Sequence, residues 1–133
     1  VLLDSMITNI DRTAKNTNLL NWNKELWLID HGASLYFHHN WNFWEAHLER
    51  TFPFVKEHVL LKKANHLAEA AQEIQSLVNE EVINNIVNSI PEDWLEEERS
   101  DFTTEEKRQA YGKFLMSRLS KIDLLVKEAS DAK

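Results

Sequence analysis

The sequence predicts a mostly α-helical domain with one small β-hairpin. Only two glycines and two prolines occur among the 133 residues, so strong helix formers run through long stretches without interruption. Most segments repeat apolar residues at the i, i+3, i+4 spacing of one helix face, whereas one pair of short runs is rich in leucine and aromatic residues. No Pro- or Gly-rich linker divides the chain, and we treat residues 1–133 as a single domain.

The composition excludes several classes of protein. The 22 acidic and 15 basic side chains give a net charge of −7, so the surface would on average repel nucleic acid. The absence of cysteine excludes disulfides, thiol catalysis and Cys-based zinc sites, and it fits a reducing compartment. No run of about 18 apolar residues and no secretory signal is visible, so we expect a soluble, cytoplasmic protein without a membrane span.

The N-terminal third combines a helix with a hairpin. Residues 1–10 carry one apolar helix stripe, which predicts a short helix. Residues 17–22 and 25–29 are too short for convincing helices, and residues 23–24 between them predict a tight hairpin turn. The glycine in residues 30–32 can adopt backbone angles that most residues avoid, so we expect the second strand to end there.

An aromatic segment and two further helices follow. Residues 36–44 are dense in aromatic side chains, and we expect them to pack beneath the segment that carries the chemistry. Asn79 is placed to cap the second of the two helices, and Pro91 stops it. The first helix is expected to bury Leu67, Ala70, Ala71, Ile74, Leu77 and Val78 on one face. The second is expected to do the same with Val82, Ile83, Ile86, Val87 and Ile90.

The longest predicted helix begins at a capping box. Thr103 and Glu106 have the S/T-x-x-E spacing in which each side chain bonds the other residue's backbone N–H. We expect this helix to continue without a break to its last stripe residue, and residues 130–133 to be frayed. Its apolar stripe comprises Tyr111, Phe114, Leu115, Leu119, Ile122, Leu125 and Val126.

Three polar residues around the hairpin have the order used in phosphoryl transfer from ATP. That reaction needs a carboxylate near the incoming hydroxyl and oxygen ligands that hold magnesium against the phosphates. Asn16 follows Asp11 by five positions, which is the Asp-to-Asn spacing of a protein-kinase catalytic loop. Asp30 comes 14 positions later, across the hairpin, and precedes His31-Gly32 where kinases have Phe-Gly. The three side chains could therefore converge on one metal site.

Longer stretches around these residues carry a family resemblance. The segments DRTAKNTNLL and WLIDHGASLYFHHNW closely resemble a HipA-like kinase family of bacterial proteins, relatives of the phosphatidylinositol-kinase branch. Residues 90–95, IPEDWL, look like a further motif near the C-terminal end of that family. The resemblance covers roughly residues 3–119 and is most specific in the first forty.

The resemblance implies a role for each candidate residue. Asp11 would be the catalytic carboxylate, and Asn16 and Asp30 would bind magnesium and through it ATP. Arg12 would stabilise the loop or approach a phosphate, and Asn18 is a second amide within reach. The implied reaction transfers the γ-phosphoryl group of ATP to a hydroxyl acceptor, which could be a protein serine, a lipid or a small molecule.

The sequence also departs from a complete kinase. His31 replaces the usual Phe without removing the metal ligand. With only Gly32 and Gly112, the chain cannot form the Gly-rich loop that covers ATP phosphates, and ten residues before Asp11 leave no room for the strand lysine. Val1 stands where a translated protein would have Met, which suggests processing, a cloning boundary or an excised fragment. We therefore expect the large lobe of a HipA-like kinase, without its small ATP-binding lobe and inactive alone.

Plainer interpretations compete with each functional one. An isolated Asp-Arg pair is most often a surface cap or ion pair. His38-His39, with His31 and His47 nearby, could bind a metal, but adjacent histidines point apart and no H-E-x-x-H spacing is present, which favours packing or solvation. The tryptophans could stack nucleic-acid bases, although core packing suits an acidic protein better. These five residues are Trp22, Trp27, Trp41, Trp44 and Trp94.

Two surfaces could serve partners instead of chemistry. The acidic run of residues 92–98 is interpreted as a solvated helix end, with partner docking as the alternative. The stripe of the C-terminal helix could form a homodimer if nothing covers it. As an alternative function, the chain could be a non-catalytic helical interaction module of kinase ancestry.

Overall fold

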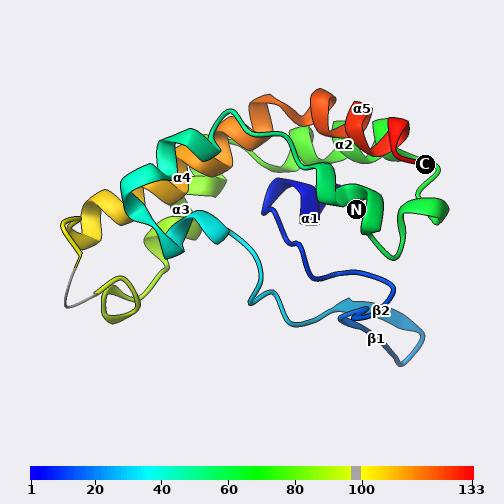
Figure 1. The fold of residues 1–133 in the computed structure, drawn as a ribbon, viewed down its shortest axis with the longest axis horizontal. Helices are drawn as coiled ribbons and strands as arrows, with labels where there is room; N and C mark the ends of the chain where they lie inside the picture. The colour runs from blue at the N-terminus through cyan, green and yellow to red at the C-terminus, as the bar shows by residue number, and fades with distance from the viewer. Residues whose placement is uncertain (97–99) are drawn as a thin grey trace.

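The computed structural model describes residues 1–96 and 100–133, which form helices and one hairpin as predicted (Figure 1). The α-helices are α1 (Leu2–Met6), α2 (Leu67–Leu77), α3 (Glu80–Asn88), α4 (Thr104–Ser120) and α5 (Ile122–Asp131). The strands are β1 (Leu19–Trp22) and β2 (Glu25–Leu28). Short 3₁₀ segments are η1 (Tyr36–His39), η2 (Trp41–His47), η3 (Pro53–Glu57), η4 (Leu61–Lys63) and η5 (Glu92–Trp94). Within the described residues, no helix is both long and apolar enough to cross a membrane.

The α-helices form two packed groups, one around α5 and one around α4. Helix α5 packs on α1 and α2, whereas α4 packs on α3 and η2. Figure 1 shows α4 and α5 following one another along one long side of the molecule, with the hairpin projecting away from the helices. One hydrophobic cluster lies between α1, α2 and α5, and a second lies between η1, η2 and α4.

The hairpin has the predicted two-residue turn. The strands pair antiparallel, with Leu19 opposite Leu28 and Trp22 opposite Glu25. Asn23 and Lys24 have φ angles of 52° and 66°, so both lie in the left-handed region that a type I′ turn requires. The tight hairpin turn predicted at residues 23–24 is therefore confirmed.

The capping signals are confirmed. Thr103 Oγ1 accepts a hydrogen bond from the Glu106 backbone N at 3.2 Å, and Glu106 Oε2 accepts one from the Thr103 backbone N at 2.8 Å. Asn79 Oδ1 accepts from the Val82 backbone N at 3.0 Å and so caps α3. Both caps satisfy backbone donors that a helix start leaves without partners.

The prediction of one unbroken C-terminal helix is wrong. Helix α4 ends at Ser120, and α5 begins at Ile122 after Lys121, whose ψ of 17° departs from the helical value. The break has a packing reason, because α4 buries one face on α3 and η2 while α5 buries another on α1 and α2. The fraying prediction is also wrong, since α5 continues to Asp131 and Lys133 Nζ donates to Ala64 O at 2.7 Å.

Some stripe residues lie outside the core. Leu77, at the end of α2, is exposed, whereas Leu67 and Ala71 of the same helix are buried. Ile86 is exposed because it borders a pocket, whereas Ile83 and Val87 on the same helix are buried.

The aromatic segment packs on α4, not beneath the candidate catalytic loop. The Phe37 ring lies 4.7 Å from the Phe114 ring and 5.3 Å from the Tyr111 ring, measured between centroids. The prediction that the tryptophans pack in the core is correct for the buried Trp44. It is wrong for the exposed Trp22 and Trp27, which lie on the hairpin, and for the exposed Trp94. Of the acidic run, residues 97–98 lie outside the described residues.

Candidate active site

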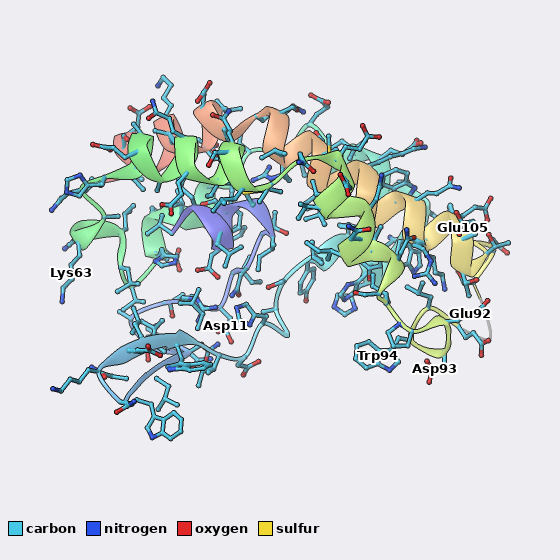
Figure 2. All side chains as sticks on the ribbon, turned by 180° about the vertical axis from the view of Figure 1, so that it is seen from behind. Asp11, Lys63, Glu92, Asp93, Trp94 and Glu105 are labelled. Atoms are coloured by element: carbon cyan, nitrogen blue, oxygen red, sulfur yellow. The ribbon has the colours of Figure 1, made fainter. Side chains whose placement is uncertain are left out.

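Two backbone hydrogen bonds connect the stretch before Asp11 with the stretch after the hairpin. Ile10 N donates to Ala33 O at 3.4 Å, and Leu35 N donates to Ile7 O at 2.7 Å. The stretch after the hairpin therefore runs beside the stretch before Asp11. Figure 2 shows Asp11 close to the hairpin, on the side that faces α1.

The carboxylate of Asp11 meets two amide side chains. Its Oδ2 accepts from Asn16 Nδ2 at 2.7 Å and from Asn18 Nδ2 at 3.3 Å. Asn18 Nδ2 also lies 3.4 Å from the backbone O of Asp30, whose own Oδ1 accepts from Gly32 N at 3.3 Å. Of the three predicted site residues, Asp11 and Asn16 are thus in direct contact, and Asp30 is joined to them through Asn18.

A local turn explains why a spacing of five brings Asp and Asn together. Thr13 N donates to the backbone O of both Asp11 and Asn16, at 3.0 and 2.9 Å. Thr13 Oγ1 in turn accepts from Lys15 N and Asn16 N, each at 3.3 Å. The side-chain hydroxyl thereby replaces backbone partners inside the turn, as Ser and Thr do in short loops.

Beneath the loop lies a buried polar network centred on Asp4. The Asp4 carboxylate accepts from Arg12 Nε at 2.9 Å and from Asn9 Nδ2 at 2.9 Å, and the Asp4 and Arg12 side chains are both 0% exposed. Burial alone would raise the pKa of Asp4, but hydrogen bonds from His58, Arg12 and Asn9 outweigh it and hold that pKa well below the usual range. Asp4 is therefore ionised and compensates the buried guanidinium.

His58 extends this network from a distant part of the chain. Its Nδ1 accepts from Leu60 N at 3.0 Å, so its Nε2 carries the hydrogen and donates to Asp4 Oδ2 at 3.0 Å. The same segment pairs with the loop, because Val59 N donates to Arg12 O at 3.0 Å and Thr13 forms a bridge with residue 58. Tertiary contacts therefore hold the loop in addition to the local ones.

The position of Arg12 decides between its two predicted roles. Its Nη1 donates to the backbone O of Asn18, and to that of Ile29 at 3.3 Å, which ties both strands of the hairpin to the loop. The Arg12 side chain is fully buried, so it has no exposed surface that a phosphate could contact. Arg12 therefore stabilises the loop.

One comparison with known proteins identifies a family for this chain. Residues 1–123 match the sequence model of a family described as HipA-like kinase. The chain belongs to the HipA-like kinase family. Neither the curated proteins nor the solved structures contain a match. Family membership confirms the resemblance, whereas the individual roles of Asp11, Asn16 and Asp30 remain predictions.

The donor set in this HipA-like chain suits magnesium better than a softer metal. Because Asn16 donates from Nδ2 to Asp11 and Asp30 accepts at Oδ1, the oxygens that could hold a cation are Asn16 Oδ1 and Asp30 Oδ2. Carboxylate and amide oxygens are hard ligands, and magnesium commonly takes only one or two carboxylates together with phosphates and waters. Across residues 1–96 and 100–133, no group of three or more His, Cys, Asp or Glu side chains is placed to hold a metal.

Three of the four histidines considered for a metal site, His38, His39 and His47, lie against aromatic rings. His38 Nδ1 lies 3.2 Å from Tyr111 Oη, and the His38 and His39 rings are 4.4 Å apart. Burial, and then the neighbouring His39, lower the pKa of His38. His47 also has a lowered pKa, through burial and the charge of Arg50.

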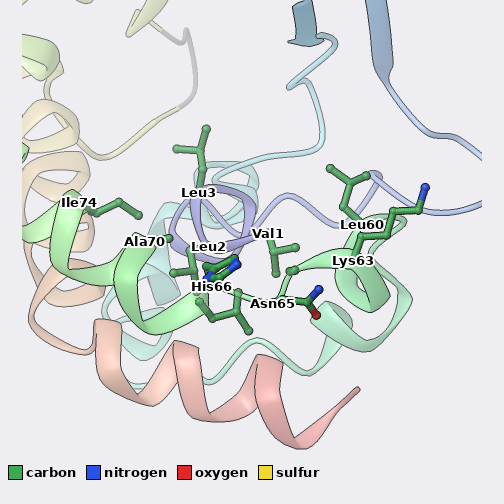
Figure 3. Close-up of a pocket in the computed structure, with 11 residues that line it drawn as sticks. Val1, Leu2, Leu3, Leu60, Lys63, Asn65, His66, Ala70 and Ile74 are labelled. Atoms are coloured by element: carbon green, nitrogen blue, oxygen red, sulfur yellow. The ribbon is translucent and has the colours of Figure 1, made fainter.

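A separate pocket of about 450 Å³ lies between α1, η4 and the start of α2 (Figure 3). Leu2, Leu3 and Ala70 belong to its mostly apolar lining, together with the polar Asn65 and His66. None of the three candidate site residues lines it, so we do not assign the phosphoryl-transfer chemistry to it.

Sequence reasoning missed the buried support of the HipA-like loop. Asp4 and Asn9 are polar residues within or just after an apolar helix stripe, and that interruption is a signal of buried polar partners. His58 carries no such signal, because its contact with Asp4 spans 54 positions. Asn18 was recognised only as an amide within reach, and the structure places it between Asp11 and Asp30.

Proposed function

We propose that this chain supplies the hydroxyl-positioning and magnesium-binding part of an ATP-dependent phosphotransferase. The reaction transfers the γ-phosphoryl group of ATP to a hydroxyl acceptor. The observation that carries the proposal is the cluster of Asp11 Oδ2 with the amides of Asn16 and Asn18, on a loop anchored by the buried Asp4–Arg12 pair. Membership of the HipA-like kinase family supports the same chemistry.

Asp11 orients the acceptor hydroxyl in this proposal. The hydroxyl oxygen forms a bond to the γ-phosphorus, the bond from that phosphorus to the ADP oxygen breaks with its electron pair on ADP, and the hydroxyl proton passes to the Asp11 carboxylate. The two amides hold the carboxylate in one orientation, so its remaining oxygen can face the acceptor. Positioning of this kind accounts for most of the catalysis in phosphoryl transfer.

Asn16 and Asp30 are the proposed magnesium ligands and, through the metal, hold ATP. When bound, magnesium neutralises charge that develops on the phosphates. The left-handed backbone at Asp30, with φ of 51°, turns the chain sharply after β2, and the Gly32 N–H holds one carboxylate oxygen. The other oxygen is then available for the metal.

The chain needs a second set of groups to act on ATP. Its only glycines are Gly32 and Gly112, so no loop with several glycines can close over the phosphates. We therefore expect these 133 residues to show no ATP turnover alone, and to contribute activity only with a small lobe that carries a Gly-rich loop and a strand lysine. Such an enzyme would work in the cytoplasm.

A phosphorylation assay tests the proposal. With a small lobe supplied, Asp11→Ala should lower the rate of ATP turnover by roughly 10²-fold or more, and Asp123→Ala on the exposed side of α5 should leave it unchanged. Equal rates for Asp11→Ala and the parent would reject the role of Asp11. Robust turnover by the 133 residues alone, abolished in Asp11→Ala, would support the site but reject the requirement for a second lobe.

A further inference from the structure

Asn18 lies directly before β1, where the loop that carries Asp11 meets the hairpin. Its backbone O accepts hydrogen bonds from Arg12 Nη1 and from Ile29 N, the second at 3.0 Å. Its φ of 45° lies in the left-handed region, which asparagine tolerates better than most residues with a Cβ. Main-chain contacts therefore fix the position of Asn18 without using its side chain.

The side-chain amide of Asn18 connects two parts of the candidate site. Its Nδ2 donates to Asp11 Oδ2 at 3.3 Å and to the backbone O of Asp30 at 3.4 Å. An amide nitrogen carries two hydrogens, so both bonds form at once. The reverse orientation of the amide would place its oxygen against a carboxylate oxygen and a carbonyl oxygen, which fixes the position of the nitrogen. One side chain thus joins the carboxylate proposed to orient the acceptor to the residue proposed to bind magnesium.

Asp30 depends on contacts at both its backbone and its side chain. Its backbone O is held by Asn18, and its side-chain Oδ1 accepts from Gly32 N at 3.3 Å. Its φ of 51° is uncommon for a residue with a Cβ, and such a conformation persists only where surrounding contacts hold it. Loss of the Asn18 amide would therefore release the Asp30 peptide and change the direction of its carboxylate.

We propose that Asn18 is a positioning residue that couples Asp11 to Asp30. Its amide orients the Asp11 carboxylate and the Asp30 turn together, so a displacement of one residue is transmitted to the other. Holding the acceptor-binding and metal-binding groups in one arrangement is the contribution that phosphoryl transfer most requires from a protein. The roles of the two aspartates rest on the proposed function, whereas the connection through Asn18 needs neither magnesium nor ATP.

An NMR comparison of ¹⁵N-labelled 133-residue chains tests the connection without any ligand. Asp11→Ala should shift the backbone signal of Gly32, whose N–H holds the Asp30 carboxylate. The shift should be much smaller when Asp11→Ala is made in an Asn18→Gly background, because glycine keeps the left-handed backbone and lacks the amide. Asn23→Gly is the matched control, since Asn23 also has a left-handed φ of 52° but lies at the tip of the hairpin, and the full shift should persist there.

Asn18→Ala is a second background, because alanine removes the same amide but restricts the backbone more than glycine does. The Gly32 shift caused by Asp11→Ala should be reduced in this background as well. Agreement between the two backgrounds assigns the effect to the missing amide, not to a loosened main chain. Equal Gly32 shifts in the parent, Asn18→Gly and Asn18→Ala backgrounds would overturn the coupling.

Magnesium affinity tests the same coupling at the proposed active site. A titration with magnesium chloride in the presence of ATP, followed at Gly32, should give roughly three- to tenfold weaker binding in Asn18→Gly, because the bonds that orient Asp30 are lost. Asn18→Gly should weaken binding less when Asp11→Ala is already present, since one end of the connection is then missing. Additive effects of the two substitutions would contradict coupling through Asn18.

The two kinds of measurement distinguish this inference from the proposed function. If magnesium-dependent ATP binding is absent while the Gly32 shift still requires the Asn18 amide, the connection stands and the phosphotransferase role falls. If magnesium and ATP bind equally to the parent and to Asn18→Gly, and the Gly32 shift does not require the amide, the phosphotransferase role stands and the coupling falls.

Discussion

Arg12, the neighbour of the candidate catalytic Asp11, donates from Nε to Oδ2 of Asp4 at 2.9 Å, and neither side chain has any exposed surface. The pair joins α1 to the loop, and the Arg12 guanidinium also reaches backbone oxygens on both strands of the hairpin. A fully buried charge pair is costly to form, but breaking it by removing one partner is costlier. The position of Asp11 therefore depends on Asp4.

We predict that Asp4→Asn lowers the free energy of unfolding by about 3–5 kcal/mol, because it leaves the Arg12 charge buried without compensation. Urea unfolding followed by circular dichroism measures the change. Asp131→Asn is the matched control, since its partner Lys127 lies on the exposed surface of α5, and it should cost less than about 0.5 kcal/mol. Equal effects of the two variants would contradict the role of Asp4.

The low pKa of Asp4 predicts a loss of stability in acid. A carboxylate whose folded pKa lies below its unfolded value contributes stability above the unfolded pKa, here near 3.8, and loses it as pH falls further. The free energy of unfolding should therefore decrease below about pH 4. The decrease should be smaller in Asp4→Asn, measured at the same pH values, and identical slopes would show that Asp4 does not cause it.

Local signals predicted much of the fold, and distant contacts did not follow from them. Asn79, Thr103 and the turn at Asn23 act on neighbours within a few positions, so the sequence predicts them. The break at Lys121 depends on which helices α4 and α5 pack against. A pattern within one helix does not contain that information.

The contacts of the candidate site also divide into local ones that follow from the sequence and distant ones that do not. The spacing of Asp11 and Asn16 suggested that their side chains could converge, and a single turn at Thr13 brings them into contact. The support from His58 required a contact across 54 positions. The exposed indole of Trp94 was also unpredicted, since apolar content alone favours burial, while the fold leaves that turn at the rim of a pocket.

The capping box should contribute measurably to α4. Thr103→Ala removes the acceptor for Glu106 N and is expected to lower the free energy of unfolding by about 0.5–2 kcal/mol. Thr104→Ala, one position into the helix, should have a smaller effect because its hydroxyl donates to the exposed Glu92 carboxylate at 3.3 Å. A larger loss in Thr104→Ala than in Thr103→Ala would contradict the cap assignment.

The hairpin turn offers a stabilising substitution. Lys24 has φ of 66°, a region that costs residues with a Cβ roughly 1–2 kcal/mol but is open to glycine. Lys24→Gly should therefore slow amide hydrogen exchange in β1 and β2, and Lys24→Val should accelerate it. Faster exchange in Lys24→Gly would show that the turn does not adopt this conformation.

Isothermal titration of the 133-residue chain with ATP, in the presence and absence of magnesium, tests the central claim most directly. The account predicts binding that requires magnesium and is weakened roughly tenfold or more in Asp30→Asn, while Asp123→Asn binds like the parent. Binding that is equal in Asp30→Asn and the parent, or no magnesium-dependent binding with or without a small lobe, would contradict it. In that case, the chain would be a non-catalytic helical interaction module of the HipA-like kinase family.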